Sequence, residues 1–471
     1  MIVVMSDLHL VDGTASGHTL SAPTREAFLA DVVALARQTG ATEVRLLLLG
    51  DIVDLIRTQQ WLEEAPEDRP WGAHGLRDVA GPAPGSRTAA RCLDILGCFP
   101  ADGRRESVAQ PSILRHNWET FAFFRNFPET IRERLGRELP VEVIYVIGNH
   151  DRLCNLYPAV RDELQRVLGL EVDEETTITV PSGEWVYPYH YVDEAHGLFA
   201  RHGHQFDPFS FEGPEFDHAA HMEPSVSDVI SAEIVVRIPH TLASLQPHHP
   251  AVEDRLIENL KDVDDVRPFG SAVDWFHYRV DKEDNRAVRR ALEETFDRVL
   301  SDFLSLPFVR EWEHPRMELD EVVRAVTHPR LQPLVDRVID VTNSDWLLRI
   351  LLPNIDKFAY HGGGSDKYTE AAYEEAIWRN NPAIHFIVYG HTHRAMVQPL
   401  SASSGDQVVY LNTGTWRNQI FRTLPADQSQ APFVKLKQMT YVFLYNEQEN
   451  RRRVGVKGPG FDVRTTHSYE P

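Results

Sequence analysis

Short apolar runs that end at a glycine or a polar residue predict the β-strands of this protein. The clearest is 46–49, four leucines followed by Gly50, which is typical of a strand buried on both faces. Similar runs occupy 2–5 and 141–147. Apolar positions at helical spacing over 24–39 predict a helix between the strands at 2–5 and 46–49. A strand, a helix and a strand in this order form a βαβ unit, so we expect a parallel pair.

The strand pattern continues through the chain, with two long interruptions. The tail from Asn450 is predicted to be a surface strand followed by a flexible end. A helix is expected around 158–168. Further strands are predicted at 176–180, 184–191, 197–200, 384–389, 408–411 and 441–445.

The interruptions predict two insertions in one α/β core. Residues 57–139 form the first, with helical stretches over 112–136. We expect their aromatic side chains in the core or in a packed lid rather than in a base-stacking platform. Residues 206–383 form the second, which is helical and leaves 1–205 and 384–471 as the two parts of the core. The amphipathic stretches that predict its helices are 251–262, 285–305, 317–326, 333–352 and 366–379.

Composition narrows the possible partners. The 471 residues include 70 acidic and 48 basic ones, for a net charge of −22. This balance disfavours nucleic acid as a partner, because nucleic-acid binders usually carry a basic stripe. The three cysteines form no CxxC pair, which fits a reducing cytoplasm. No apolar run approaches the ~18 residues that a membrane span needs. The sequence gives no indication of oligomeric state.

Side chains that can bind a metal follow five of the predicted strands. Asp51 is the first example, because Gly50 allows a sharp turn that presents its carboxylate at the edge of the sheet. On this stretch alone, Asp51 fits a helix N-cap equally well. The repetition of the pattern favours a metal site. The residues concerned are Asp7 and His9, Asp51, Asn149 and His150, His202, and His391 and His393.

The chemistry of these side chains indicates two divalent ions. Carboxylate, imidazole and amide oxygen without thiolate suit manganese, iron (Fe²⁺ or Fe³⁺) or zinc. Seven of these eight side chains, all but His150, are too many ligands for one such ion and enough for two, with Asp51 between them. Two carboxylates, Asp7 and Asp51, leave a local charge of roughly +2 that can hold a phosphate oxyanion.

The ordered motifs resemble those of the calcineurin-like metallophosphoesterase superfamily. They are Asp7-Leu8-His9, Gly50-Asp51, Gly148-Asn149-His150-Asp151, His202-Gly203-His204 and Gly390-His391-Thr392-His393. The resemblance implies a four-layer α/β (α+β) sandwich of two mixed β-sheets flanked by helices. It also implies that Asp7, His9, Asp51 and His393 bind one metal, and that Asp51, Asn149, His202 and His391 bind the other.

Within this superfamily, the residues of the motifs are similar to those of the UDP-diacylglucosamine pyrophosphohydrolase branch. The chain departs from that branch in having His150 where the branch has arginine, and in its longer insertion at 206–383. We expect this insertion to cap the site and select the substrate, because it begins directly after His202 and ends directly before His391.

The resemblance implies hydrolysis of a phosphoester, a monoester or a diester of a small molecule, by a metal-activated water. His150 would protonate the leaving oxygen, and Asp151 would orient its ring. Asp54 is interpreted as a residue that supports the ligands or starts a helix. Two alternatives stay open: a nuclease of the same superfamily, and a non-catalytic metal-binding scaffold whose insertion binds a partner.

Overall fold

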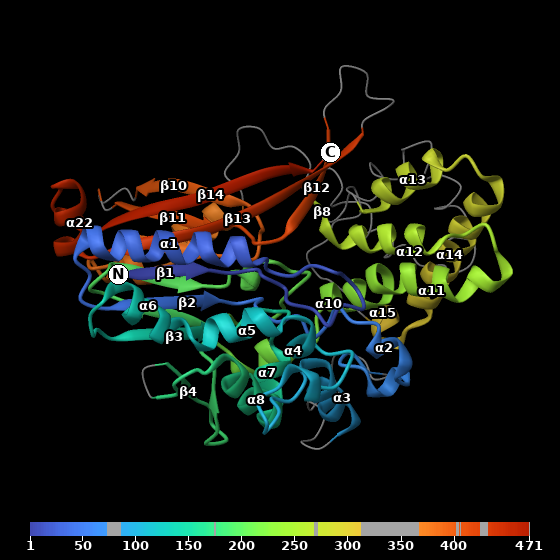
Figure 1. Cartoon of the computed structure of the whole chain (residues 1–471), viewed down its shortest axis with the longest axis horizontal. Helices are drawn as coiled ribbons and strands as arrows, with labels where there is room; N and C mark the ends of the chain where they lie inside the picture. The colour runs from blue at the N-terminus through green and yellow to red at the C-terminus, as the bar shows by residue number, and fades with distance from the viewer. Residues whose placement is uncertain are drawn as a thin grey trace.

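Two β-sheets packed face to face form the centre of the molecule (Figure 1). The computed structural model describes residues 1–72, 86–173, 176–267, 272–311, 367–401, 405, 407–423 and 432–470. The first sheet has the strand order β3-β2-β1-β13-β12-β8, with β14 also paired to β13. Its strands are β1 (Ile2–Met5), β2 (Val44–Leu49), β3 (Val141–Val146), β8 (Val266–Arg267), β12 (Asn418–Arg422), β13 (Phe433–Tyr445) and β14 (Gly460–Glu470).

The second sheet has the strand order β10-β11-β9-β7-β6. Its three central strands are parallel, and both edge strands are antiparallel to their neighbours. These strands are β6 (His190–Asp193), β7 (Leu198–Arg201), β9 (Phe386–Tyr389), β10 (Ala395–Ser401) and β11 (Gln407–Thr413). A separate hairpin is formed by β4 (Ile178–Thr179) and β5 (Trp185–Val186).

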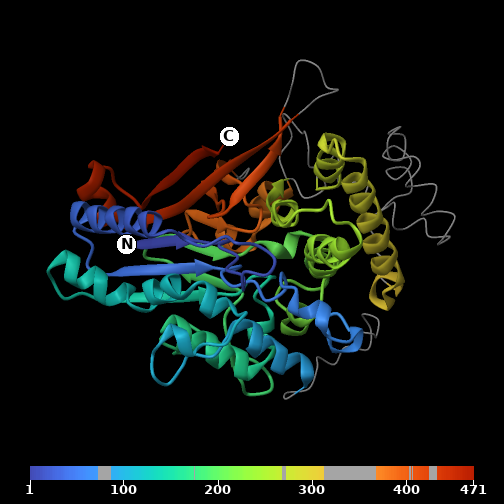
Figure 2. The same ribbon diagram turned by 45° about the vertical axis from the view of Figure 1, so that its right-hand side comes forward.

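Helices cover the outer faces of both sheets and make up most of the described part of the 206–383 insertion (Figures 1 and 2). Those before the insertion are α1 (Ala22–Thr39), α2 (Gln60–Glu63), α3 (Arg87–Leu96), α4 (Ile113–His116), α5 (Trp118–Arg125), α6 (Phe127–Leu135), α7 (Leu153–Leu156) and α8 (Pro158–Leu168). Those within and after it are α9 (His218–Met222), α10 (Val226–Ile230), α11 (Arg237–Leu245), α12 (Asp254–Leu260), α13 (Ala272–Lys282), α14 (Arg286–Ser305), α15 (Pro307–Glu311), α20 (Lys367–Glu374), α21 (Ala376–Asn380) and α22 (Glu447–Val454).

The alternation of side chains along β1 explains why the sheets are covered on both faces. Ile2 and Val4 point into the core between the two sheets, whereas Val3 and Met5 point into the core beneath the helices. In the same way, Leu47 and Leu49 of β2 lie between the sheets. A third apolar cluster joins the outer face of the second sheet to α20 and α21. The predicted α/β class, with two mixed sheets flanked by helices, is confirmed.

The predicted βαβ unit is also confirmed. Strands β1 and β2 pair in parallel, from Ile2 opposite Arg45 to Met5 opposite Leu48. Between them, α1 begins after Ser21, whose side chain accepts a hydrogen bond from the Thr24 N–H, and it ends at Gly40 with a φ of 60°. Burial of each leucine of β2 contributes roughly 2 kcal/mol.

The C-terminal segment differs from the prediction. The expected flexible end is wrong: α22 covers 447–454, and β14 pairs with β13 from Gly460 opposite Tyr445 to Glu470 opposite Lys435. The pattern also gave no indication of β10 or β12. Both strands expose much of one face, so they lack the continuous apolar run by which the buried strands were recognised.

The described part of the second insertion is helical as expected, but one strand ties it to the core. Strand β8 pairs in parallel with β12, with Val266 opposite Ile420 and Arg267 opposite Phe421. Helix α14 confirms the predicted helix at 285–305. The helices predicted at 317–326 and 333–352 lie outside the described residues.

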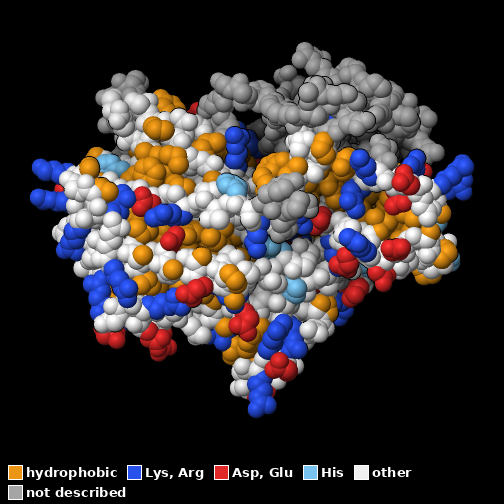
Figure 3. All heavy atoms as spheres, turned by 45° about the horizontal axis from the view of Figure 1, so that its top comes forward, with side chains coloured by type: hydrophobic (Ala, Val, Ile, Leu, Met, Phe, Trp, Pro, Cys, Tyr) orange, Lys and Arg blue, Asp and Glu red, His pale blue; other side chains and the backbone are white. Residues whose placement is uncertain are grey.

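The surface of the described part carries both kinds of charge. Figure 3 shows basic and acidic side chains interspersed over the described part of one face. In the portion of the chain that the structure describes, no helix combines the length and the apolarity that crossing a membrane requires.

A buried histidine gives a prediction about stability. His196, between β6 and β7, has Nδ1 3.0 Å from Asp193 Oδ1 and Nε2 3.4 Å from Glu449 Oε2. Burial alone would lower the pKa of His196, but these two carboxylates raise it. A pKa raised by folding stabilises the protein below the unfolded pKa, and this stabilisation is lost as pH rises through the folded pKa.

We therefore expect His196→Gln to lower the melting temperature more at about pH 5.5 than at about pH 8.5. Thermal unfolding followed by circular dichroism measures this difference. The exposed His467 of β14 provides the control, because His467→Gln removes a histidine that is not buried. An equal loss at both pH values would contradict the stabilising role of the charged ring.

Candidate metal centre

The loops that follow β1 and β2 are joined by backbone hydrogen bonds. The Asp7 N–H donates to the Gly50 carbonyl over 3.1 Å, and the His9 N–H donates to the Asp51 carbonyl over 2.9 Å. The spacing of two between Asp7 and His9 would place both on the same side if β1 continued that far. Instead β1 ends at Met5, and a loop carries both residues to the site.

Five of the predicted ligands have an unusual backbone conformation. Among the described residues, the non-glycine positions with positive φ are Asp7, His9, Asp51, His391 and His393, with values between 45° and 66°. Such a conformation costs of order 1–3 kcal/mol per residue and persists only where the surroundings enforce it. Its restriction to predicted ligands indicates that the loops are shaped to direct these side chains.

Two glycines allow the loops to approach one another. A Cβ atom on Gly50 would lie 2.6 Å from the Nδ1 atom of His202, and one on Gly148 would lie 2.6 Å from the Asp51 nitrogen. Real Cβ atoms do not approach other atoms so closely, so neither position accepts a larger residue. The glycines before Asp51 and Asn149 are therefore needed for close packing, and Gly50, with a φ of 80°, also for the turn.

The first group of ligand atoms comes from the loops after β1 and β9. His9 Nε2 lies 2.9 Å from His393 Nε2 and 3.8 Å from Asp7 Oδ1. His393 Nε2 lies 3.3 Å from Asp7 Oδ1. These three atoms are close enough to bind one metal ion, as the sequence predicted.

The second group comes from the loops after β2, β3, β7 and β9. His202 Nε2 lies 3.1 Å from Asp51 Oδ2, and His391 completes this group. Asn149 Oδ1 lies 3.1 Å from His391 Nδ1, so the amide oxygen is at the same place. Asp51 also lies near the first group, with Oδ2 3.7 Å from His9 Nε2. The structure thus brings all seven predicted ligands together, with Asp51 between the two groups.

The outer nitrogen of three ligand histidines meets an acceptor. His9 Nδ1 lies 2.9 Å from Asp54 Oδ2, and His202 Nδ1 lies 2.8 Å from the Leu49 carbonyl oxygen. His391 Nε2 lies 3.1 Å from Asp207 Oδ2. Each acceptor favours the ring proton on its own side, so that the inner nitrogen of the neutral ring keeps its lone pair for an ion.

Burial and crowding shift the pKa values of these groups. Burial, with Asp51 adding to it, raises the pKa of Asp7 to about 7. Burial lowers the pKa of His9 to about 3. His202 behaves differently: burial opposes the charged ring, but Asp51 raises its pKa to about 10. Without an ion, the charged His202 ring is the positive group that faces the two carboxylates, a role that divalent cations would take over.

His150 and Asp151 do not interact in the expected way. His150 is 6% exposed, and its Nδ1 lies 3.2 Å from Asp54 Oδ2. Burial would lower the pKa of His150, but Asp54 raises it. Asp151 instead accepts hydrogen bonds from the N–H groups of Gly148 and Ile52 and from the Tyr145 hydroxyl. The expectation that Asp151 orients the His150 ring is wrong, because its carboxylate holds the loops together.

The site contains two side chains that sequence reasoning missed, Asp207 and Arg267. Asp207 follows His204 at the start of the insertion and contacts both His391 and Lys367. Arg267 belongs to β8, and its Nη2 lies 3.1 Å from His393 Nδ1. Neither lies in a recognisable motif. The only available signal for Asp207 was its position five residues after His202.

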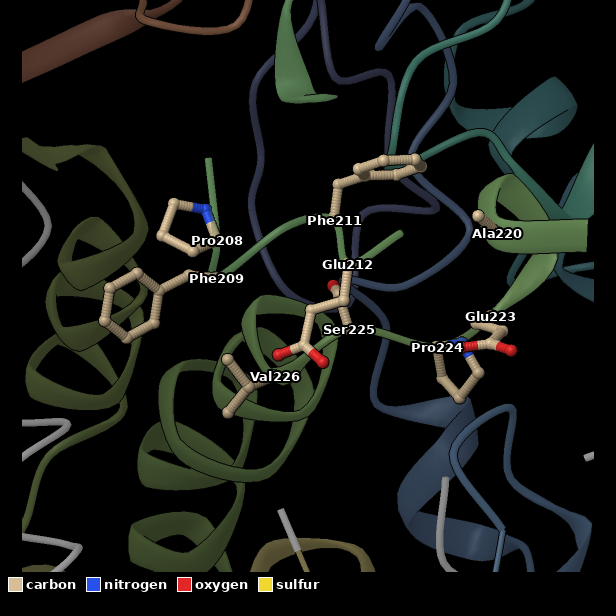
Figure 4. Close-up of a pocket in the computed structure, with 9 residues that line it drawn as sticks. All are labelled: Pro208, Phe209, Phe211, Glu212, Ala220, Glu223, Pro224, Ser225 and Val226. Atoms are coloured by element: carbon tan, nitrogen blue, oxygen red, sulfur yellow. The ribbon is translucent and has the colours of Figure 1, made fainter. Parts of the chain in front are cut away.

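A pocket lies in the first part of the insertion, between the loop at 208–212 and the segment 220–226 (Figure 4). Phe211 lines it, and its ring centroid lies 5.7 Å from that of His204. The His204 ring lies 5.5 Å from the His202 ring. One histidine thus separates this pocket from the metal ligands.

No family model matches the chain, and no match was found among curated proteins. The chemistry assigned to the centre therefore depends on its residues and their geometry.

Asp54 gives a prediction that needs no metal. Its carboxylate faces His9 and His150, and its Oδ1 accepts the N–H groups of Ile56 and Arg57. We expect Asp54→Ala to lower the free energy of unfolding by about 3 kcal/mol, because it leaves buried donors without an acceptor. Urea denaturation of the metal-free protein measures this change.

Asp102 is the matched control for Asp54. Its carboxylate also accepts a backbone N–H, that of Arg104, but it is exposed. Asp102→Ala should leave the free energy of unfolding nearly unchanged. Equal effects of the two substitutions would show that Asp54 is not a buried structural acceptor.

Proposed function

We propose that this protein hydrolyses a phosphoester with the help of two divalent metal ions, as the calcineurin-like metallophosphoesterases do. One observation supports this most strongly: the Asp51 carboxylate lies between two groups of ligand atoms. Its Oδ2 is 3.1 Å from His202 Nε2 on one side and 3.7 Å from His9 Nε2 on the other. A shared carboxylate is the usual feature of centres that hold two ions ~3.5–4 Å apart.

The residues present fit such ions. Among the described residues, Asp7 Oδ1 is buried and makes no hydrogen bond, and His202 Nε2 lies 3.1 Å from Asp51 Oδ2 without a well-directed one. Buried polar atoms are normally paired, so unpaired ones that converge with other ligands favour an ion as the missing partner. In our proposal Asp7, His9, Asp51 and His393 hold one ion, and Asp51, Asn149, His202 and His391 hold the other. Nitrogen and oxygen ligands without sulfur suit Mn²⁺, iron or Zn²⁺.

The ions would supply the nucleophile and neutralise charge on the phosphoryl oxygens. The protein's own contribution to proton transfer comes from His150. The backbone N–H of His150 donates to Asp51 Oδ1 over 2.9 Å, which holds His150 beside the shared carboxylate. Because Asp54 faces Nδ1, that nitrogen carries a proton and the charged ring is stabilised. His150 can then donate a proton to the leaving oxygen, while Asp54 takes the orienting role first assigned to Asp151.

The proposed substrate is a phosphomonoester or phosphodiester of a small molecule. The insertion at 206–383 would cap the site, because residues near both ends of the insertion reach the centre. Asp207 lies next to His391, and Lys367 pairs with Asp207. All three cysteines, Cys92, Cys98 and Cys154, are free thiols, and on that basis we propose the cytoplasm as the location.

The shared carboxylate predicts how many ions each variant binds. Asp51→Asn should lose both ions, whereas His9→Ala should lose chiefly the ion bound with Asp7 and His393. Metal content per chain after dialysis against Mn²⁺, measured by mass spectrometry, gives the number directly. His467→Ala, far along the chain on exposed β14, is the control and should match the wild type. Equal ion content in Asp51→Asn and wild type would rule out the bridge.

His150 predicts a separation between binding and turnover. His150→Ala should retain its metal content but lose about 10²–10⁴-fold in kcat, the usual contribution of a general acid. Hydrolysis of a chromogenic phosphomonoester and of its diester, each with added Mn²⁺, measures this loss and identifies the preferred ester. If the wild type holds both ions but hydrolyses neither ester, the scaffold alternative is favoured. If it hydrolyses single-stranded DNA, the nuclease alternative is favoured.

A further inference from the structure

We propose that Arg267 is a phosphate-binding residue supplied by the insertion, and that metal binding to His393 releases it for this role. The proposal rests on the function proposed above and extends it to the residue that contacts the substrate anion. It starts from a mismatch in the hydrogen-bonding partners of the four ligand histidines.

Three of these histidines donate their outer ring proton to an acceptor, as metal-bound histidines usually do. His393 is the exception. Its outer nitrogen, Nδ1, lies 3.1 Å from Arg267 Nη2. A guanidinium has donors only, so His393 Nδ1 must act as an acceptor in this contact and the ring proton must be on Nε2.

That arrangement conflicts with a bound ion. His393 Nε2 faces the first ligand group, 2.9 Å from His9 Nε2 and 3.3 Å from Asp7 Oδ1. When Nε2 gives its lone pair to a cation, the neutral ring carries its proton on Nδ1. Two donors, Nδ1–H and the guanidinium, would then face each other. The contact between Arg267 and His393 is therefore broken when the ion binds.

Arg267 differs from the two arginines near it in having no ionic partner. Arg57 pairs with Asp264, and Arg417 pairs with Asp264 and Asp265. Arg267 makes no ion pair with any described carboxylate. Its Nη1 donates only to two backbone carbonyls of its own segment, those of Asp264 and Val266, both over 2.8 Å.

The backbone of Arg267 is nevertheless fixed. It lies opposite Phe421 in the β8–β12 pair, which holds it beside the centre. An arginine guanidinium is charged at neutral pH, and the side chain of Arg267 is partly exposed. A charged, planar guanidinium on a fixed strand, next to a metal ligand and without a described carboxylate partner, can donate hydrogen bonds to two oxygens of a phosphoryl group.

Calorimetry on the full-length chain separates the two parts of the proposal. Mn²⁺ is titrated first, and inorganic phosphate is then titrated into the Mn²⁺-loaded protein. We expect Arg267→Gln to weaken phosphate binding about tenfold, because charge-assisted hydrogen bonds are lost. Mn²⁺ affinity should rise by up to about tenfold, because the competing donor has gone and the glutamine oxygen can accept from Nδ1–H. Phosphate binding to metal-free protein should be weak in both proteins.

Two further variants complete the test. Arg255→Gln removes the same charge from the exposed face of α12 and should change neither affinity. Arg267→Lys keeps the charge without the planar fork and should give an intermediate loss of phosphate affinity, which preserves the test if Arg267→Gln fails to fold.

The contrary outcomes differ for each part. Unchanged phosphate affinity in Arg267→Gln would overturn the binding role. Lower Mn²⁺ affinity would overturn the release, since Arg267 would then support His393 rather than compete with the ion. If the Mn²⁺-loaded wild type bound no phosphate, or the wild type bound no Mn²⁺, the proposed function would fail together with this inference.

Discussion

The structure depends on holding two carboxylates and several imidazoles in two groups, in each of which the ligand atoms lie within 4.8 Å of one another. Asp7 and Asp51 repel each other there, and desolvation acts on every member of the set. Five residues also adopt a backbone conformation that L-amino acids avoid. Each strained residue opposes folding by roughly 1–3 kcal/mol, against a net stability of only about 5–15 kcal/mol for an ordinary domain.

The two sheets provide the compensation. Their central strands are buried on both faces, and the ligand loops leave from strand ends that are fully packed, as with Met5 and Leu49. Backbone hydrogen bonds between the loops, such as Asp7 to Gly50, prevent the turns from relaxing. Two further carboxylates restrain the site. Asp151 ties the loops together by hydrogen bonds, and Asp54 orients the rings of His9 and His150.

Much of this arrangement was predictable, and for a physical reason. Buried parallel strands require continuous apolar runs, and a ligand at a strand end requires a glycine or a turn before it, so β1, β2, β3 and the Gly50-Asp51 turn appear directly in the sequence. Ring partners are different, because adjacency along the chain does not determine which carboxylate faces a ring. This is why Asp151 was assigned a role that belongs to Asp54. Asp207 and Arg267 reach the centre only through the path of the insertion, which no local pattern specifies.

The position of β1 within the first sheet has a consequence for how the protein is made. Its partner on one side, β2, is synthesised soon after it, but its partner on the other side is β13, at 433–445. A growing chain therefore presents the open edge of β1 to the cell until nearly all of the core has been synthesised, and such edges readily pair with other chains. Residues 7 and 393 must also meet before the first ligand group exists. The centre can form only late in synthesis, and folding dominated by contacts between distant residues is intrinsically slow.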